Sequence, residues 1–288
     1  MNLAIGTAQF GLNYGISNKK GLISIEEGKK ILDFSIQNGI DTLDTAVLYG
    51  KSEINLGTIG VDNFKVITKI PNLPNCELDI NNWINQIVNN SKKNLNISSI
   101  YAVLMHRPSD LLSPYGKEIY ESLFELKKSG IIDKIGISSY SCSEIELLIR
   151  KFSFDIVQTP LNLIDRNLLE SKLLKKLKKQ NIEIHVRSIF LQGILLLPRN
   201  KIPIQFENWN YLWDKWHDWL NTNNINPVQA CLSYVKNVDE IDKVIVGIDS
   251  IKHIQKIVEY YNQDFSYEFP NIASKNINLI NPSKWQNI

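Results

Sequence analysis

Four side chains suited to proton transfer stand at or just beyond the ends of apolar, β-branched segments of the chain. Asp44 closes one segment and Tyr49 lies just beyond it, while Lys69 and His106 end the next two. If these segments are neighbouring parallel strands, an acid, a phenol, an amine and an imidazole converge at one mouth of the sheet. Together they make a proton-transfer site.

Tyr49 is the predicted general acid of this set. A free phenol has a pKa of about 10, so it is protonated at neutral pH but gives up its proton slowly. We expect the ammonium group of Lys69 to lower that pKa, and Asp44 to supply the counter-ion that a buried lysine needs. His106 is expected to donate a hydrogen bond to the substrate oxygen.

Such a site supplies a proton but no electrons, so it predicts a cofactor that donates hydride, most naturally a nicotinamide. No G-x-G-x-x-G or Walker-type loop is present, which excludes the doubly wound mode of binding. Another interpretation makes Lys69 the Schiff-base nucleophile of a lyase. It is disfavoured because Asp44 would keep the amine protonated.

The positions of these residues depend on a repeated strand–helix pattern. Short apolar segments alternate with amphipathic stretches along the 288 residues, which suits an α/β fold and specifically a (β/α)8 TIM barrel. We predict one barrel over residues 1–263 and a tail over 264–288. The eight predicted strands are Leu3–Thr7, Thr42–Thr45, Lys65–Ile70, Ser99–His106, Lys134–Ser138, Ile156–Thr159, Glu183–Ile189 and Lys243–Ile248.

Turn and cap residues mark where the predicted helices begin and end. Ser24 to Glu27 forms a capping box, and Asn226 before Pro227 predicts a helix start. Asn38-Gly39, Ser129-Gly130 and Gln180-Asn181 each supply a residue tolerant of positive φ before the next strand.

Two later segments are predicted to border the substrate pocket or to pack on the barrel. The stretch 196–206 is predicted to be a long loop that serves as a substrate wall or lid. Trp209, Trp213 and Trp216 recur at helical spacing and predict a helix packed on the barrel exterior, with Trp209 or Trp213 in the substrate pocket as the alternative. Because the sequence starts directly on the first strand, we expect the polar tail after Asp264 to seal the bottom of the barrel.

The composition argues against several classes of partner. Lys and Arg total 32 against 30 Asp and Glu, spread along the chain, so nucleic acid and membrane surfaces are not expected partners. No apolar run approaches the roughly 18 residues that span a bilayer, and we expect a cytoplasmic protein. Cys76, Cys142 and Cys231 are widely separated, so no metal site is predicted.

The residues around Asp44 and Tyr49, DTAVLYGKSE followed by Leu56-Gly57, resemble the signature of the aldo/keto reductase superfamily. The resemblance continues in order over residues 3 to 260. Its further motifs are Ile67-Thr68-Lys69, Met105-His106-Arg107-Pro108, the segment 130–138, and Gln158 to Asn162 with Arg166.

The resemblance implies the catalytic set named above and a cofactor site. Ser138 and Gln158 would hold the nicotinamide carboxamide, while Ser188 and the segment from Gly247 to Ile251 would hold the pyrophosphate and adenosine. Arg187 replaces the usual ring-stacking aromatic residue and is expected to stack on the nicotinamide or to reach the pyrophosphate.

The position that often binds the 2′-phosphate of NADPH aligns with Ser250, which carries no charge. Lys252 and Lys256 lie close enough to substitute, with help from His253, so NADPH is the favoured cofactor and NADH the alternative. We predict an NAD(P)H-dependent reductase of a small aldehyde or ketone, including sugars and sugar-nucleotide intermediates, acting as a monomer or small homo-oligomer. The alternative function is a nucleotide-binding, redox-sensing subunit with little turnover.

Overall fold

Eight parallel strands close into a barrel, as the alternating pattern predicts. In the computed structural model, which describes residues 1–16, 21–74 and 79–285, each strand pairs with the next and β8 pairs with β1. The strands are β1 (Leu3–Gly6), β2 (Thr42–Asp44), β3 (Lys65–Ile70), β4 (Ile100–Met105), β5 (Ile132–Ser138), β6 (Ile156–Pro160), β7 (Glu183–Arg187) and β8 (Lys243–Gly247).

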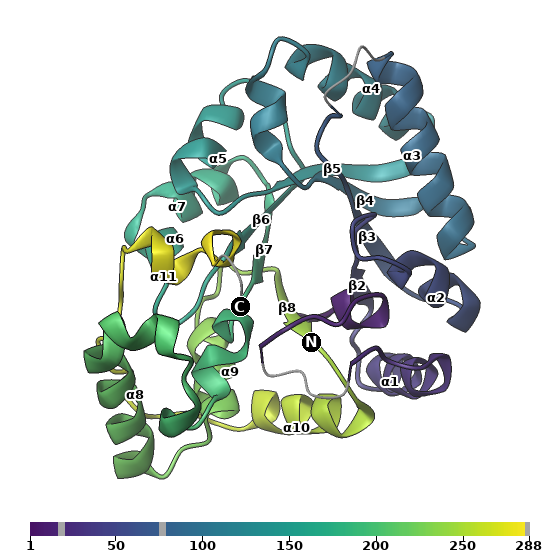
Figure 1. Cartoon of the computed structure of the whole chain (residues 1–288). Coiled ribbons are helices and arrows are strands. Elements are labelled where there is room, and N and C mark those ends of the chain that lie inside the picture. The colour runs from purple at the N-terminus through teal and green to yellow at the C-terminus, as the bar shows by residue number, and fades with distance from the viewer. Residues whose placement is uncertain (17–20, 75–78, 286–288) are drawn as a thin grey trace.

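Helices surround the ring of strands (Figure 1), and the predicted (β/α)8 TIM barrel is confirmed. The main apolar core fills the layer between strands and helices, while Ile67, Ala102, Leu104 and Ile156 form a smaller cluster. The helices are α1 (Ile25–Gln37), α2 (Ser52–Ile59), α3 (Ile80–Leu95), α4 (Gly116–Lys128), α5 (Cys142–Leu148), α6 (Asn167–Glu170), α7 (Leu173–Lys179), α8 (Asn210–Asn223), α9 (Pro227–Lys236), α10 (Ile251–Asn262) and α11 (Ile277–Ile280).

The predicted caps are present. Ser24 accepts a hydrogen bond from the N–H of Glu27 at the start of α1, although the Glu27 carboxylate bonds to the N–H of Ile251 and does not complete the capping box. Asn226 caps α9 by accepting the N–H of Val228. The turns before β2, β5 and β7 place Gly39, Gly130 and Asn181 at positive φ. Local sequence therefore sets where these elements begin and end.

The chain after β7 departs from the predicted course. The strand ends at Arg187 instead of Ile189 because Ser188 adopts the left-handed conformation, with a φ of 57°. Leu191, Gln192 and Gly193 are left-handed as well, so residues 188–193 form a strained turn. The predicted long loop over 196–206 contains short 3-10 turns that lead to α8.

The tryptophan-rich segment forms α8 and packs on the barrel. Trp213 and Trp216 are fully buried, and their indole N–H groups donate to the carbonyl oxygens of Phe206 and Leu195. Trp209 is partly buried against the same core. The prediction of a packed exterior helix is confirmed for this segment.

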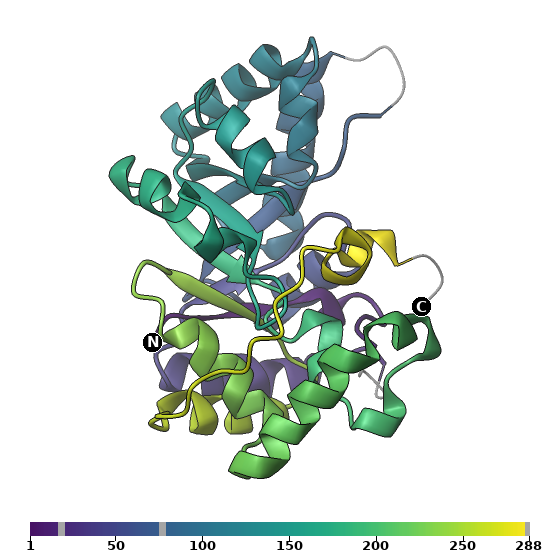
Figure 2. The ribbon, with the colours of Figure 1, turned by 90° about the vertical axis from the view of Figure 1, so that its left-hand side faces the viewer.

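The prediction that the tail seals the bottom of the barrel is wrong. After α10 the tail crosses the outside of α9 (Figure 2), where Phe269 packs edge-to-face on Tyr234. The N–H of Ser274 then donates to the carbonyl of Ile164, which follows the carboxyl end of β6. The described tail thus reaches the mouth end of the barrel, because its aromatic residues pack on α8 and α9.

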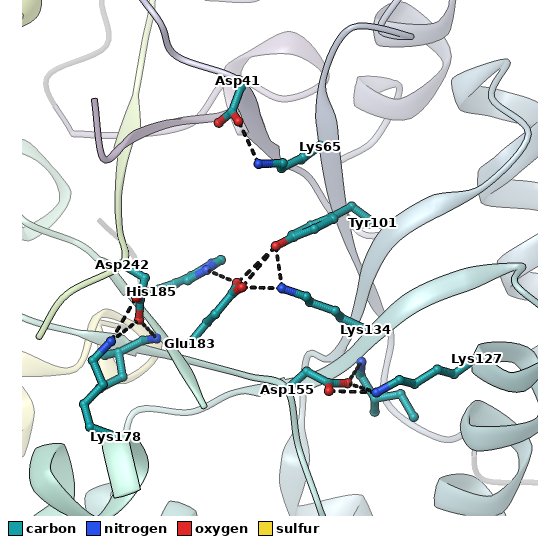
Figure 3. Close-up of polar contacts among 12 residues, drawn as sticks. Asp41, Lys65, Tyr101, Lys127, Lys134, Asp155, Lys178, Glu183, His185 and Asp242 are labelled. Atoms are coloured by element: carbon teal, nitrogen blue, oxygen red, sulfur yellow. Dashed lines mark hydrogen bonds and ion pairs between the residues drawn. The ribbon is translucent and has the colours of Figure 1, made fainter. Parts of the chain in front are cut away.

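Charged side chains gather instead at the bottom of the barrel (Figure 3). Asp41 accepts hydrogen bonds from Lys243 at 2.8 Å and Lys65 at 2.9 Å. Glu183 pairs with Lys134 and accepts from the Tyr101 hydroxyl at 3.2 Å. We call the set the basal ion cluster: Asp41, Lys65, Tyr101, Lys134, Glu183, His185 and Lys243.

The basal ion cluster makes stability sensitive to acid. Partial burial would raise the pKa of Glu183, but hydrogen bonds from His185 and Lys134 outweigh it and lower the pKa to about 2. Burial is likewise outweighed at Asp41, where hydrogen bonds from Lys243 and Lys65 lower the pKa. Because both carboxyls titrate near pH 4 when unfolded, their stabilisation is complete above about pH 5 and declines as the pH falls toward 2.

We therefore expect the free energy of unfolding in urea to decrease between about pH 5 and pH 3. The matched variant Glu183→Gln removes one of the two carboxyls and should show a shallower decrease over the same range. An identical pH dependence in this variant and the parent protein would contradict the assignment.

Candidate active site

A cavity of about 430 Å³ lies at the carboxyl end of the strands, within the roughly 300–1,000 Å³ usual for small-molecule and cofactor sites. Most of the predicted site residues line it. These are Asp44, Tyr49, Lys69, His106, Ser138, Gln158, Arg187, Ser188 and Gly247.

A chain of hydrogen bonds crosses the barrel beneath this cavity. The Lys69 ammonium group lies 2.6 Å from a carboxylate oxygen of Asp44 and 2.8 Å from the carbonyl of Thr45. The other oxygen of Asp44 accepts from the Gln158 amide at 2.7 Å, and Gln158 accepts from the Ser138 hydroxyl at 2.9 Å. The chain fixes the rotamers of four buried polar side chains.

Close backbone packing holds Tyr49 at the cavity. A Cβ on Gly11 would lie 1.9 Å from the carbonyl oxygen of Tyr49, so only glycine permits this approach. Gly50 has a φ of 58°, and a Cβ there would lie 2.5 Å from the Gly11 carbonyl oxygen. The hydroxyl of Ser52 also donates to the carbonyl of Thr7 at 2.9 Å. The connection after β1 and the Tyr49 turn are therefore joined.

The four catalytic candidates meet at one end of the cavity. The Lys69 nitrogen lies 5.1 Å from the centre of the Tyr49 ring, and the rings of Tyr49 and His106 are 6.0 Å apart, edge to face. Asp44 is joined to this group through Lys69.

The expectation that Lys69 makes Tyr49 more acidic is not met. Burial and then the nearby Asp44 carboxylate raise the pKa of Tyr49 well above its ordinary value, and only the charge of Arg187 opposes them. The physical reason is that removing the phenol from water has the largest effect, while Lys69, bonded to Asp44 at 2.6 Å, is not among the causes. Tyr49 therefore holds its proton at every physiological pH.

His106 is neutral in this environment. Burial, followed by the charge of Lys69, lowers the pKa of His106 to about 4. Its Nδ1 atom is buried and has no hydrogen-bond partner in the described part of the chain. A neutral imidazole can still donate one hydrogen bond, as the predicted role requires.

Two of the predicted cofactor residues lie outside the cavity lining. Ser250 is buried at the start of α10, where its hydroxyl donates to Asp249, and the side chain of Lys252 is exposed. This end of the cavity is lined by Asp249 and His253. The carboxylate of Glu27 accepts the N–H of Ile251 at 2.8 Å, so the first amide of α10 is already bonded to an anion.

Several residues that line the cavity are not among those predicted from the sequence. Gln9 follows β1, and its Oε1 atom is buried with no partner in the described residues. The rule used for the other strands, polar residues at carboxyl ends, would have found it. Gln192 bridges the mouth by donating to the Tyr14 hydroxyl at 2.6 Å, while Tyr140 contacts Arg187. These contacts join loops that are far apart in the sequence, so no spacing of residues along the chain predicts them.

Over the described ranges, no helix is both long and apolar enough to cross a membrane. Within the same ranges, no group of three or more His, Cys, Asp or Glu side chains is arranged to hold a metal ion. Cys142 and Cys231 are free thiols, and Cys76 lies outside the described residues.

Comparison with known proteins identifies relatives of the whole barrel. Residues 2–277 match the profile of the aldo/keto reductase family. The oxidoreductase sirO of Leptosphaeria maculans is 25% identical, over 88% of this chain and 86% of that protein. The holo form of the aldo-keto reductase AKR11C1 from Bacillus halodurans superposes with a TM-score of 0.72 at 20% identity, covering 92% of this chain and 88% of that one. PA4992 from Pseudomonas aeruginosa, assigned to the same family, gives 0.65 at 21% identity, covering 90% and 89%.

Proposed function

This chain belongs to the aldo/keto reductase family, and from that premise we propose that it reduces an aldehyde or ketone to an alcohol with a nicotinamide dinucleotide, Tyr49 acting as general acid. The observation that carries the proposal is the grouping of Tyr49, Lys69 and His106 around one end of a cavity. Each of these groups can act on a carbonyl oxygen placed between them.

The chain's own residues supply the proton and the orientation. The neutral His106 imidazole donates a hydrogen bond to the carbonyl oxygen, and Tyr49 releases its proton to that oxygen as negative charge develops there. The Lys69–Asp44 ion pair fixes the ammonium group 5.1 Å from the Tyr49 ring. A bound nicotinamide would supply the hydride.

The cavity suits an extended dinucleotide. Ser138 and Gln158 offer amide and hydroxyl groups at the catalytic end, and the lining continues past Gly247 to His253 at the other. Gln9 also lines this route, and its buried Oε1 atom has no partner in the described residues, so a rotation of its side-chain amide would offer a ligand a hydrogen-bond acceptor.

The charges at the far end favour NADH, in contrast to the preference for NADPH expected from the sequence. That preference depended on Lys252 and Lys256, whose side chains are exposed and outside the cavity lining. His253, which was expected only to help, lines this end beside Asp249. Asp249 lines this end, 3.3 Å from Nδ1 of His253, and the Glu27 carboxylate outside the lining already accepts the N–H of Ile251. Carboxylates at this end suit the hydroxyls of a ribose better than a 2′-phosphate. We therefore propose that NADH binds at least as tightly as NADPH.

Titration of protein fluorescence with each reduced cofactor checks this prediction. We expect a dissociation constant for NADH equal to or below that for NADPH, and Glu27→Gln should shift the ratio toward NADPH by removing one negative charge. Glu125→Gln, which removes an exposed carboxylate on α4 outside the cavity lining, is the matched control and should leave the ratio unchanged. Tighter binding of NADPH by the parent protein would contradict the proposal.

The activity itself is tested with the purified protein, both reduced cofactors and a panel of aldehydes, ketoses and nucleotide-linked ketosugars. We expect loss of the reduced-cofactor absorbance with at least one of them. A protein that binds neither cofactor would overturn the proposed function. The cytoplasmic location and the monomeric or small homo-oligomeric state remain predictions.

A further inference from the structure

Arg187 is a cation held rigidly at the cavity wall. Its guanidinium group lies 3.9 Å from the centre of the Tyr140 ring, so one flat face is covered by that ring. Its Nε donates to the Ser138 hydroxyl at 3.3 Å, and Nη1 donates to the Ser188 hydroxyl at 3.4 Å. The stacking and the two hydrogen bonds to neutral hydroxyls orient the guanidinium group of Arg187 but do not neutralise its charge.

The charge of Arg187 is not balanced by an ion pair. Lys69, the other cation at the catalytic end, lies 2.6 Å from the Asp44 carboxylate, whereas Arg187 forms no ion pair with any carboxylate in residues 1–16, 21–74 or 79–285. His106 is neutral because its pKa is lowered to about 4 by burial and the charge of Lys69. Among the described residues that line the catalytic end, Arg187 thus leaves one excess positive charge; the buried Asp165, which feels the charge of Arg187, lies outside this lining.

This excess charge is close enough to be felt by the reacting groups. Arg187 is among the causes that lower the pKa of Lys69 and of His106, each after burial, and it opposes the burial that raises the pKa of Tyr49. At the far end of the same cavity Asp249 lies 3.3 Å from Nδ1 of His253. The charge of Arg187 is therefore placed at the end of the cavity where the carbonyl would react.

We propose that Arg187 binds an anionic group of the carbonyl substrate, so that this enzyme acts on aldehydes or ketones that carry a carboxylate or phosphate near the carbonyl carbon. The inference rests on the proposed function and names its substrate class. A planar guanidinium binds carboxylate and phosphate oxygens with two parallel hydrogen bonds, and the partly buried site strengthens them. It is an alternative to the expectation that Arg187 stacks on the nicotinamide, and Tyr140 leaves one face of the guanidinium group uncovered.

The test compares charged and neutral substrates in Arg187→Met and Arg187→Lys. The probes are 5-oxopentanoate against its methyl ester, and glyceraldehyde 3-phosphate against glyceraldehyde. In Arg187→Met we expect kcat/KM for the preferred anion to fall by about 10- to 100-fold, with less than about a threefold change for its neutral partner. Arg187→Lys keeps the charge without the fork and should lose less. A loss confined to 5-oxopentanoate would identify a carboxylate as the bound group, and a loss confined to glyceraldehyde 3-phosphate would identify a phosphate.

Arg166→Met is the matched control. Arg166 also lies over a tyrosine ring, that of Tyr234 at 5.2 Å, but it is outside the cavity lining. Its loss should change the charged and neutral substrates equally. Thermal unfolding of each variant shows that differences do not come from misfolding.

Three outcomes would overturn the proposal. The first is an equal loss for charged and neutral substrates in Arg187→Met, and the second is a dinucleotide dissociation constant that rises in this variant, which would assign Arg187 to the pyrophosphate. The third is a cofactor-loaded parent protein that binds neither succinate nor inorganic phosphate in calorimetric titrations. If the dinucleotide still binds in these experiments, the proposed function is not contradicted. Failure of the proposal for Arg187 is therefore distinguishable from failure of the proposed function.

Discussion

Replacing Tyr49 by phenylalanine should lower turnover by about 100- to 10,000-fold while leaving the affinity for the dinucleotide unchanged. The ring of Tyr49 stays between Lys69 and His106 in this variant, so the packing is preserved and only the proton donor is lost. Stopped-flow absorbance of the reduced cofactor measures the rate, and fluorescence titration measures the binding.

Tyr120→Phe is the control for this change. The Tyr120 hydroxyl donates to the carbonyl of Ser153 on the outside of the barrel, so its loss removes a comparable hydroxyl without touching the cavity. Undiminished turnover in Tyr49→Phe would refute the role given to the phenol. Tight cofactor retention with very slow turnover in the parent protein would instead favour the alternative of a redox-sensing subunit.

Replacing Lys69 by methionine should destabilise the protein by roughly 3–5 kcal/mol and abolish most turnover. The change leaves the carboxylate of Asp44, which is 3% exposed, without its cation, although Gln158 still donates to it. An uncompensated buried charge is among the most costly defects in a core. The free energy of unfolding in urea at neutral pH measures the effect.

Two variants separate this effect from the loss of a lysine in general. Lys69→Met combined with Asp44→Asn should recover much of the stability but little of the activity, because it removes both charges. Lys65→Met, in the same strand, breaks a half-exposed ion pair with Asp41 and should cost no more than about 1 kcal/mol. If the two single variants lose equal stability, burial of Lys69 is not the cause.

The sequence predicts those features that depend on short-range pattern. Alternating segments place all eight strands within two residues of their observed ends, and the strand-end rule brings Asp44, Lys69 and His106 to one mouth. The end of β7 was misplaced because a single dihedral, the φ of Ser188, decides it.

Contacts between distant segments could not be predicted. The hydrogen bond between Gln158 and Asp44 crosses the barrel, and the bond of Glu27 to Ile251 joins α1 to α10. Both depend on side-chain rotamers that only the assembled barrel fixes. The burial that raises the pKa of Tyr49 is of the same kind, since residue type does not say how far a side chain is removed from water.

The strained turn at residues 188–193 has a kinetic consequence. Gln192 is bonded to Tyr14, and its carbonyl accepts the N–H of Ile16. These two hydrogen bonds, which we call the latch, join the turn after β7 to the loop after β1, two strands away around the barrel. Left-handed backbone at Leu191 and Gln192 costs on the order of 1–3 kcal/mol each, which the latch must offset. Opening the latch releases that strain, so the passage of a long ligand is expected to be gated by this segment while the barrel beneath it stays rigid.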